Sequence, residues 1–188
     1  MKSFSIALAS LLLASPAWPA TIGIFATADC SSTELSLPIY GIATVYVAVN
    51  GLSTSPRFEG YGLAGAEFQI VGVPSQWIAQ SFPAPVAMVA GGDLLHGGAS
   101  ILFHSAQTGD CVLLYTVRLV ALTSANDVAL QVKTSDSRLG DPLHSCPLGI
   151  PYTPPVYGLA CMDGDALLIN STTAVERSSW SAVKRIYE

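Results

Sequence analysis

The segment from Cys111 to Leu122 constrains the fold more than any other part of the sequence. Thr116 and Arg118 occupy even-numbered positions at its centre. The odd-numbered positions are apolar: Cys111, Leu113, Tyr115, Val117, Leu119 and Ala121. Side chains of a β-strand alternate between two faces, so this pattern predicts one long strand with an apolar face and a face that is polar in the middle. Both ends are apolar on both faces, which predicts a central strand.

Shorter segments with the same alternation follow one another along the chain. In the clearest of them Ala66, Phe68 and Ile70 point inward, and Glu67 and Gln69 point outward. Segments of this kind, separated by Gly, Pro and Asn turn signals, predict an all-β fold: a two-layer antiparallel β-sandwich of the jelly-roll or immunoglobulin type. The other predicted strands are 21–27, 42–49, 86–90, 99–104, 128–134, 156–161 and 166–169.

Three local connections are also predicted. The turn at 107–110 joins strand 99–104 to the Cys111 strand as a hairpin, and a turn at 162–165 closes a second hairpin between 156–161 and 166–169. Gln76, Trp77 and Ile78 form a short turn that caps one end of the core.

The two ends of the chain differ from the middle. Residues 1–17 are predicted to be a secretory signal, with Lys2 before a short apolar run, and cleavage as late as residue 20 is the alternative. Residues 18–170 form the predicted sandwich. Residues 171–188 form a linker and a short amphipathic helix.

Charge and cysteine content indicate the compartment and exclude some partners. Without Lys2 the chain has seven basic and thirteen acidic side chains, a formal charge of −6. This argues against binding to nucleic acid or to an anionic membrane surface, and no later apolar run is long enough to span a membrane. The predicted location is therefore outside the cytoplasm: periplasmic, cell-surface or extracellular.

Four cysteines behind a signal peptide indicate two disulfides, for which three pairings exist. We favour Cys146–Cys161, which closes a Pro-rich loop, and by elimination Cys30–Cys111. A metal site is the weaker interpretation because the sequence has no C-x-x-C motif, and no metal or cofactor is predicted.

Two stretches resemble known families. The run Gly65-Ala66-Glu67-Phe68-Gln69-Ile70, a Pro-containing turn with an aromatic residue, and the long Leu-Leu-Tyr-Thr-Val strand together resemble cohesin-like exported bacterial modules over the middle half of the chain. This resemblance implies a sandwich that binds a dockerin partner through one sheet face. The tail from Trp180 to Tyr187 resembles a Trp-x-x-Val-Lys-x-x-Tyr ending of exported bacterial proteins.

Motifs for catalysis are missing from the sequence: it has no G-x-S-x-G, H-E-x-x-H, P-loop or G-x-G-x-x-G. If the protein is an enzyme, Asp93 and His96 in a glycine-flanked loop are the first candidates. Asp163 and Asp165 supply too few carboxylates for a calcium loop and predict a turn instead. Asn170 begins a glycosylation sequon.

The remaining candidate sites are aromatic. Trp77 and Tyr61, with Tyr40 and Tyr46, are candidates for a ligand-binding platform, although Trp77 is also interpreted as a core plug. In the tail a recognition role competes with simple packing on the sandwich. The tail candidates are Trp180, Val183, Lys184 and Tyr187.

These observations predict a non-catalytic exported β-sandwich that acts as a binding or surface-assembly module. Its expected partner is a protein or a glycan at the cell surface. The alternatives are a small secreted hydrolase that uses the Asp93–His96 loop, and a structural component of an envelope layer or filament.

Overall fold

The computed structural model of the 188-residue chain describes residues 20–136, 146–153 and 159–171. The signal peptide and the amphipathic tail helix predicted from the sequence lie outside these residues. So do Trp180, Val183, Lys184 and Tyr187.

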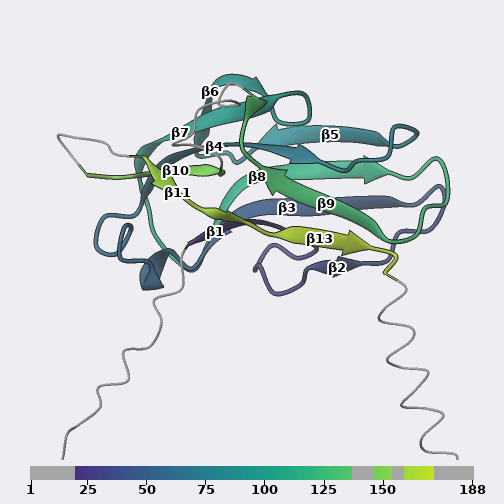
Figure 1. Ribbon diagram of the computed structural model, residues 1–188, viewed down its shortest axis with the longest axis horizontal. Coiled ribbons are helices and arrows are strands. Elements are labelled where there is room, and N and C mark those ends of the chain that lie inside the picture. The colour runs from purple at the N-terminus through teal and green to yellow at the C-terminus, as the bar shows by residue number, and fades with distance from the viewer. Residues whose placement is uncertain (1–19, 137–145, 154–158, 172–188) are drawn as a thin grey trace, which may run out of the picture.

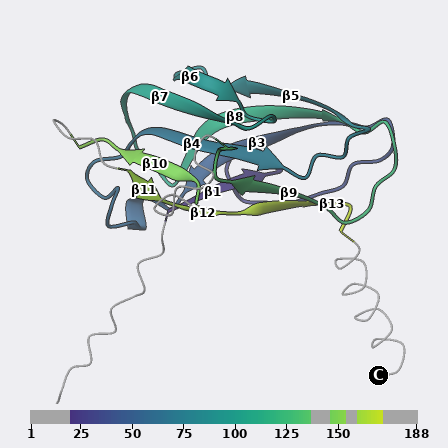
Figure 2. The ribbon, with the colours of Figure 1, turned by 45° about the horizontal axis from the view of Figure 1, so that its top comes forward.

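Two β-sheets pack face to face (Figures 1 and 2). The five-stranded sheet has the order β12 (Asp163–Gly164), β1 (Thr21–Phe25), β3 (Ile42–Asn50), β8 (Cys111–Val120) and β5 (Ile78–Pro83). The eight-stranded sheet runs β11 (Ala160–Cys161), β10 (Leu148–Pro151), β4 (Leu63–Val71), β9 (Val128–Lys133), β13 (Ala166–Ile169) and β2 (Glu34–Leu35), with β7 (Gly98–Gln107) on β4 and β6 (Ala87–Asp93) on β7.

The predicted all-β sandwich is therefore confirmed, with two additions. The short pairs β1–β12 and β13–β2 are parallel, whereas the other pairs are antiparallel. A single turn of 3-10 helix, η1 (Leu52–Thr54), follows Asn50 and Gly51.

The predicted central strand is confirmed as β8, which pairs with β3 on one side and β5 on the other. Tyr115 is 3% exposed and its ring meets that of Phe68 edge to face, with the centroids 6.1 Å apart, so the strand joins the two layers. Edge-to-face geometry is the arrangement that aromatic quadrupoles favour.

A β-bulge corrects the predicted alternation along this strand. Val47 pairs with Tyr115 while the next residue, Ala48, pairs with Leu113, so Leu114 has no opposite residue. Leu114 and Tyr115 are both buried, and Leu113, predicted to face the core, is only half-buried. An extra residue in one strand shifts the parity of everything beyond it, which a pattern of strict alternation does not contain.

The structure contradicts both predicted hairpins. β7 belongs to the eight-stranded sheet and β8 to the five-stranded sheet, so the turn at 107–110 crosses between the layers. In the second case β11 pairs with β10 and β13 pairs with β9 and β2, while Asp163 and Gly164 between them pair with β1. A short turn is compatible with either a hairpin or an arch between sheets, and only packing distinguishes the two.

Strand β5 replaces the turn that was predicted to end at Ile78. Ile78 and Phe82 are about half exposed, whereas the intervening Ala79 and Ser81 point toward the neighbouring layer. A half-buried strand usually turns its large apolar residues toward the core, whereas β5 turns small residues inward and large ones outward. Because of this inversion the sequence did not indicate β5.

Both favoured disulfides are present in the structure. Cys30 pairs with Cys111 and ties the loop after β1 to the start of β8, with the Cα atoms 5.9 Å apart. Cys146 pairs with Cys161 beside β10 and β11, with the Cα atoms 5.7 Å apart. The first bridge closes the longer loop, 81 residues against 15, so the chain-entropy model assigns it the larger stabilisation.

Asn170 ties three segments together at the end of β13. Its side-chain oxygen accepts a hydrogen bond from the backbone N–H of Leu37 at 2.8 Å, and its amide nitrogen donates to the carbonyls of Leu37 and Ala125 at 2.8 and 2.9 Å. Its φ is 54°, in the left-handed region where asparagine is better tolerated than most residues. The amide nitrogen of this sequon is thus already engaged.

We expect Asn170→Ala to lower the free energy of unfolding by about 3 kcal/mol, because three partly buried hydrogen bonds are worth about 1 kcal/mol each. Denaturant melts of the full chain measure the change. Asn126→Ala, at an exposed position in the adjacent loop, is the control and should stay within about 0.5 kcal/mol of wild type. Equal stability of the two variants would contradict the role assigned to Asn170.

Candidate functional site

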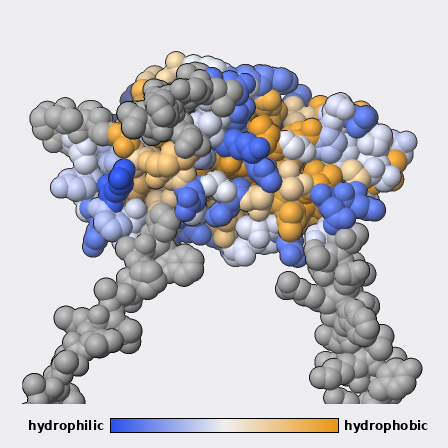
Figure 3. Space-filling view, viewed as in Figure 1, coloured by the Kyte–Doolittle hydropathy of each residue, from blue (hydrophilic) through white to orange (hydrophobic). Residues whose placement is uncertain are grey.

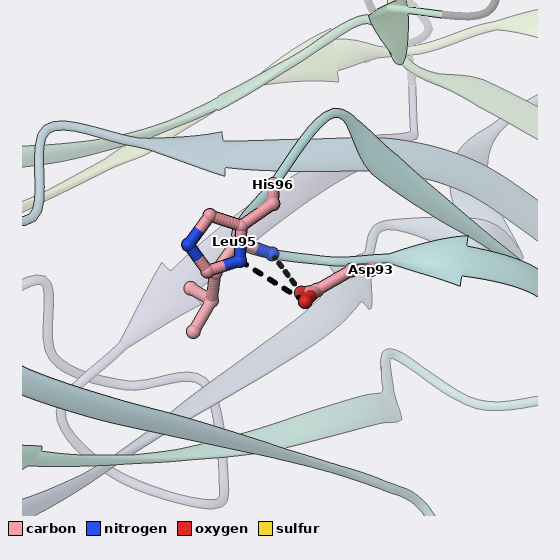
Figure 4. A network of polar contacts seen from close by, with 3 residues as sticks. All are labelled: Asp93, Leu95 and His96. Carbon is pink, nitrogen blue, oxygen red and sulfur yellow. Dashed lines mark hydrogen bonds and ion pairs between the residues drawn. The ribbon is translucent and has the colours of Figure 1, made fainter.

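The loop between β6 and β7 carries the Asp93–His96 pair (Figure 4). One carboxylate oxygen of Asp93 accepts a hydrogen bond from the backbone N–H of Leu95 at 2.9 Å, and the other lies 3.0 Å from Nδ1 of His96. Leu94 is buried, and its carbonyl accepts a hydrogen bond from the Ile70 N–H. The segment is therefore a tight turn anchored to β4, held from within by Asp93.

The electrostatics of this turn are local. The backbone N–H of Leu95, and after it the ring of His96, hold the pKa of Asp93 below its ordinary value of 3.8. Both side chains are exposed to solvent, at 81% for His96 and 56% for Asp93. Solvent screening at such exposure makes the ion pair a weak contributor to stability.

A hydrolytic site needs a nucleophile bonded to the histidine, and the described residues show none. Ser100 and Ser135 line the same shallow hollow as His96, but the hydroxyl of Ser135 donates to the carbonyl of Gly97 at 3.1 Å. Within residues 20–136, 146–153 and 159–171 no group of three or more His, Cys, Asp or Glu is placed to hold a metal ion. The hydrogen bonds that Asp93 makes within this loop hold it as a turn.

The two aromatic candidates lie in different environments. Trp77 is 6% exposed, and its indole N–H donates to the carbonyl of Thr123 at 3.0 Å, so its ring faces are packed in the core. The core-plug interpretation expects this burial, and the small exposed part of Trp77 borders a surface hollow. Tyr61, between η1 and β4, is 53% exposed and stays a candidate for ligand binding.

Trp77 and His96, far apart in the sequence, line one hollow of about 500 Å³. It lies between the β4–β5 turn and the Asp93–His96 turn, and Val73, Pro74, Ile78 and Leu95 complete the wall. The hollow is open at the surface, and Ile78 at its rim belongs to the outward side of β5.

An exposed feature built from regular structure is the outer face of β3, β8 and β5. Its side chains stand in cross-strand rows that the register sets: Ile42, Val120 and Ile78; Thr44, Arg118 and Gln80; Tyr46, Thr116 and Phe82. Tyr40 and Leu122 extend the face beyond the first row, where the N–H of Tyr40 bonds to the carbonyl of Ala121 at 2.6 Å. We call these eleven residues the Arg118 face.

Apolar side chains on the Arg118 face are unusually exposed for a sheet. Tyr40 is 74% exposed, Ile42 58%, Phe82 50% and Ile78 48%. Arg118 is the one charged residue among the eleven, and in the described part of the chain no carboxylate lies within ion-pair distance of it. Aromatic residues and arginine, with few other charges, are the composition of the centre of a protein interface.

The outer face of β6, β7 and β4 also exposes apolar side chains: Met88 is 49% exposed, Val89 44% and Leu102 37%. Met88, Leu102 and Ile150 lie in one row that crosses Gly65. Gly65 has no side chain, and the side chains of Leu102 and Ile150 border the place where one would lie. Polar groups of this face bond within the protein: the amide nitrogen of Gln69 donates to the Thr134 carbonyl at 2.7 Å and to Asp136 at 2.8 Å. Figure 3 views the molecule as Figure 1 does. On the side that faces the viewer, apolar residues gather between hydrophilic ones.

Sequence reasoning had placed Arg118 and Thr116 on the polar side of the central strand but had not identified them as a site. The missing signal was β5, which supplies Ile78, Gln80 and Phe82 to the same face. Alternation within one strand shows which residues share a face, but not which strands lie beside one another.

No protein-family model matches the sequence, and no curated protein matches it. Among solved structures, the seventh ScaB type I cohesin from Pseudobacteroides cellulosolvens is 10% identical, with 82% of this chain and 94% of that chain covered, at a TM-score of 0.51. The cohesin module of a family 33 glycoside hydrolase from Clostridium perfringens is 10% identical over 82% of this chain and 98% of that chain, at a TM-score of 0.50. At this identity the likeness shows the fold: this chain has a cohesin-like β-sandwich.

The described part of the chain contains no helix long and apolar enough to cross a membrane.

We expect His96→Ala to raise the pKa of Asp93 toward 3.8 without reaching it, because the larger cause, the Leu95 N–H, remains. Since the folded pKa is lowered, ionised Asp93 stabilises the turn above its ordinary pKa, and this contribution is lost as the pH falls through the folded value. Carbon-detected NMR titration of the carboxylate measures both variants. His104→Ala, at an exposed position of β7, is the control; an Asp93 pKa unchanged by His96→Ala would contradict the pairing.

Proposed function

We propose that this chain is a non-catalytic exported β-sandwich that binds another protein, as a partner-recognition or surface-assembly module. The observation that carries the proposal is the Arg118 face, where exposed apolar side chains on three paired strands surround one charge that has no bonded partner within the described chain. Exposed apolar residues rimmed by polar ones are found at protein interaction sites.

Three further observations support the proposal. The fold is similar to that of cohesin modules, and the sequence resemblance to cohesins implies recognition of a dockerin-type partner through a sheet face. The Asp93–His96 turn lacks a bonded nucleophile among the described residues. Two disulfides favour an oxidising compartment, in agreement with the signal peptide predicted at residues 1–17.

A structural role in an envelope layer is the second candidate function. Strands β5 and β6 lie side by side at one edge of the sandwich, and each has a single strand partner within the described chain (Figure 2). Open edges of this kind can pair with another copy. Pro83 and the Gly91–Gly92 pair interrupt them, which disfavours long-range strand addition and places this role second.

A cross-linking experiment tests the proposal. The mature chain is secreted by its own host and is cross-linked to its neighbours in the culture and envelope fractions. We expect one co-purifying protein that, once purified separately, binds the chain saturably with a Kd in the micromolar range or tighter. A panel of esterase, peptidase and glycosidase substrates should give background turnover. Turnover that His96→Ala abolishes would overturn the proposal in favour of an enzyme, and concentration-dependent polymers in sedimentation would favour the structural role.

A further inference from the structure

The Arg118 face has a charge pattern that restricts what can dock on it. We infer that it binds a protein segment that places one carboxylate opposite Arg118 and apolar side chains on either side of that carboxylate. This inference rests on the proposed function and adds the face, the chemistry of the partner and the residues that select it.

The arrangement of the rows carries the first step. Arg118 stands in the middle row with the uncharged Thr44 and Gln80, and an apolar row lies on the side of Ile42 and Ile78. On the other side Tyr46 and Phe82 flank Thr116. A strand rises about 3.4 Å per residue and neighbouring strands are about 4.8 Å apart, so the face spans about 20 Å by 10 Å. That is enough for the centre of a standard interface, where the energetically dominant residues lie.

Charge complementarity carries the second step. A cation whose cross-strand neighbours are all uncharged loses hydration when a partner covers it, so the partner must supply a carboxylate or leave the charge unpaired. Arginine suits this role because its planar guanidinium accepts a carboxylate through two parallel hydrogen bonds. A second copy of the chain docked about a two-fold axis through this face would bring Arg118 against Arg118, which disfavours self-association here.

Tyr40 supplies an independent observation. It occupies the third position of a turn closed by the hydrogen bond from the Gly41 N–H to the Pro38 carbonyl at 2.8 Å, with φ of 62°. Left-handed backbone is unfavourable for an aromatic residue, and glycine or asparagine normally occupies this place in a turn. Tyr40 is 74% exposed, and its strained backbone lies at the end of an apolar row. Strain at an exposed aromatic residue supports a role in binding.

The strands on both sides of the face are closely held by their neighbours, an arrangement that favours binding without rearrangement. Phe25 is 3% exposed and pairs with Tyr46 of the neighbouring strand. Its ring packs over Gly23, because a Cβ on Gly23 would lie 2.7 Å from it. Phe25 therefore restricts the side of Tyr46 that faces β1. On the opposite side β8 holds β5 over its full length, from Ile78 to Pro83.

Two probes test the inference on the full mature chain. The first is a phage-displayed library of random 16-residue peptides selected on wild type; the second is the co-purifying protein of the preceding subsection. We expect selected peptides to carry Asp or Glu between apolar residues, and both probes to bind Arg118→Glu at least tenfold more weakly than wild type. Selection on Arg118→Glu should return Lys or Arg at the same place.

Lys133→Glu is the matched control, because it reverses an exposed strand cation on the other sheet. We expect binding of both probes to change less than twofold in this variant. Equal binding of the co-purifying protein to wild type and Arg118→Glu would overturn the assignment of the face while leaving the proposed function intact. Failure to recover any binding protein would instead remove the proposed function.

Tyr40→Asn separates a binding role from a structural one. Asparagine tolerates the left-handed backbone, so the melting temperature should rise by about 2–4 °C while binding of both probes falls about tenfold. Unchanged binding would show that Tyr40 does not take part. Retention on a glycan array that both Arg118→Glu and Tyr40→Asn abolish, without binding of either probe, would overturn the protein partner in favour of a sugar.

Discussion

The pairing of β8 with β3 and β5 is the interaction on which the rest of the structure depends. It buries Tyr115, Val117 and Leu119 against the opposite sheet and, by the same alternation, turns Thr116 and Arg118 outward. One strand thus supplies both the centre of the core and the centre of the exposed face. A change in its register would move both sets of side chains at once, because a slip of one residue exchanges the two faces of a strand.

Covalent and polar ties act beside the ends of two strands of this sandwich. The Cys30–Cys111 disulfide holds the beginning of β8, and Asn170 joins the end of β13 to the segments that contain Leu37 and Ala125. The loop that follows Leu37 carries Tyr40 to the outer row of the Arg118 face. The ties therefore hold the framework of the Arg118 face, and preorganisation of this kind lowers the entropic cost of the binding that we propose.

A cohesin-like fold does not by itself identify a function, since one fold serves many. The site must be argued from side chains, and here the two candidate sites separate clearly. The Asp93–His96 turn satisfies its own hydrogen bonds and stays open to water. On the Arg118 face the one charge has no ion-pair partner among the described residues and several apolar side chains are exposed, and these observations support the binding role that we propose.

The sequence by itself determined the all-β class, most strand positions, the inward side of strands with regular alternation such as 66–71, and the favoured disulfide pairing. These properties depend on alternation and spacing, which are local along the chain. Only the tertiary structure decided that β7 and β8 lie in different sheets, that Leu114 forms a bulge, and that Ile78–Pro83 is a strand with its large residues outward. Those outcomes follow from how two layers fill a shared core, and the Arg118 face exists because three strands distant in sequence meet there.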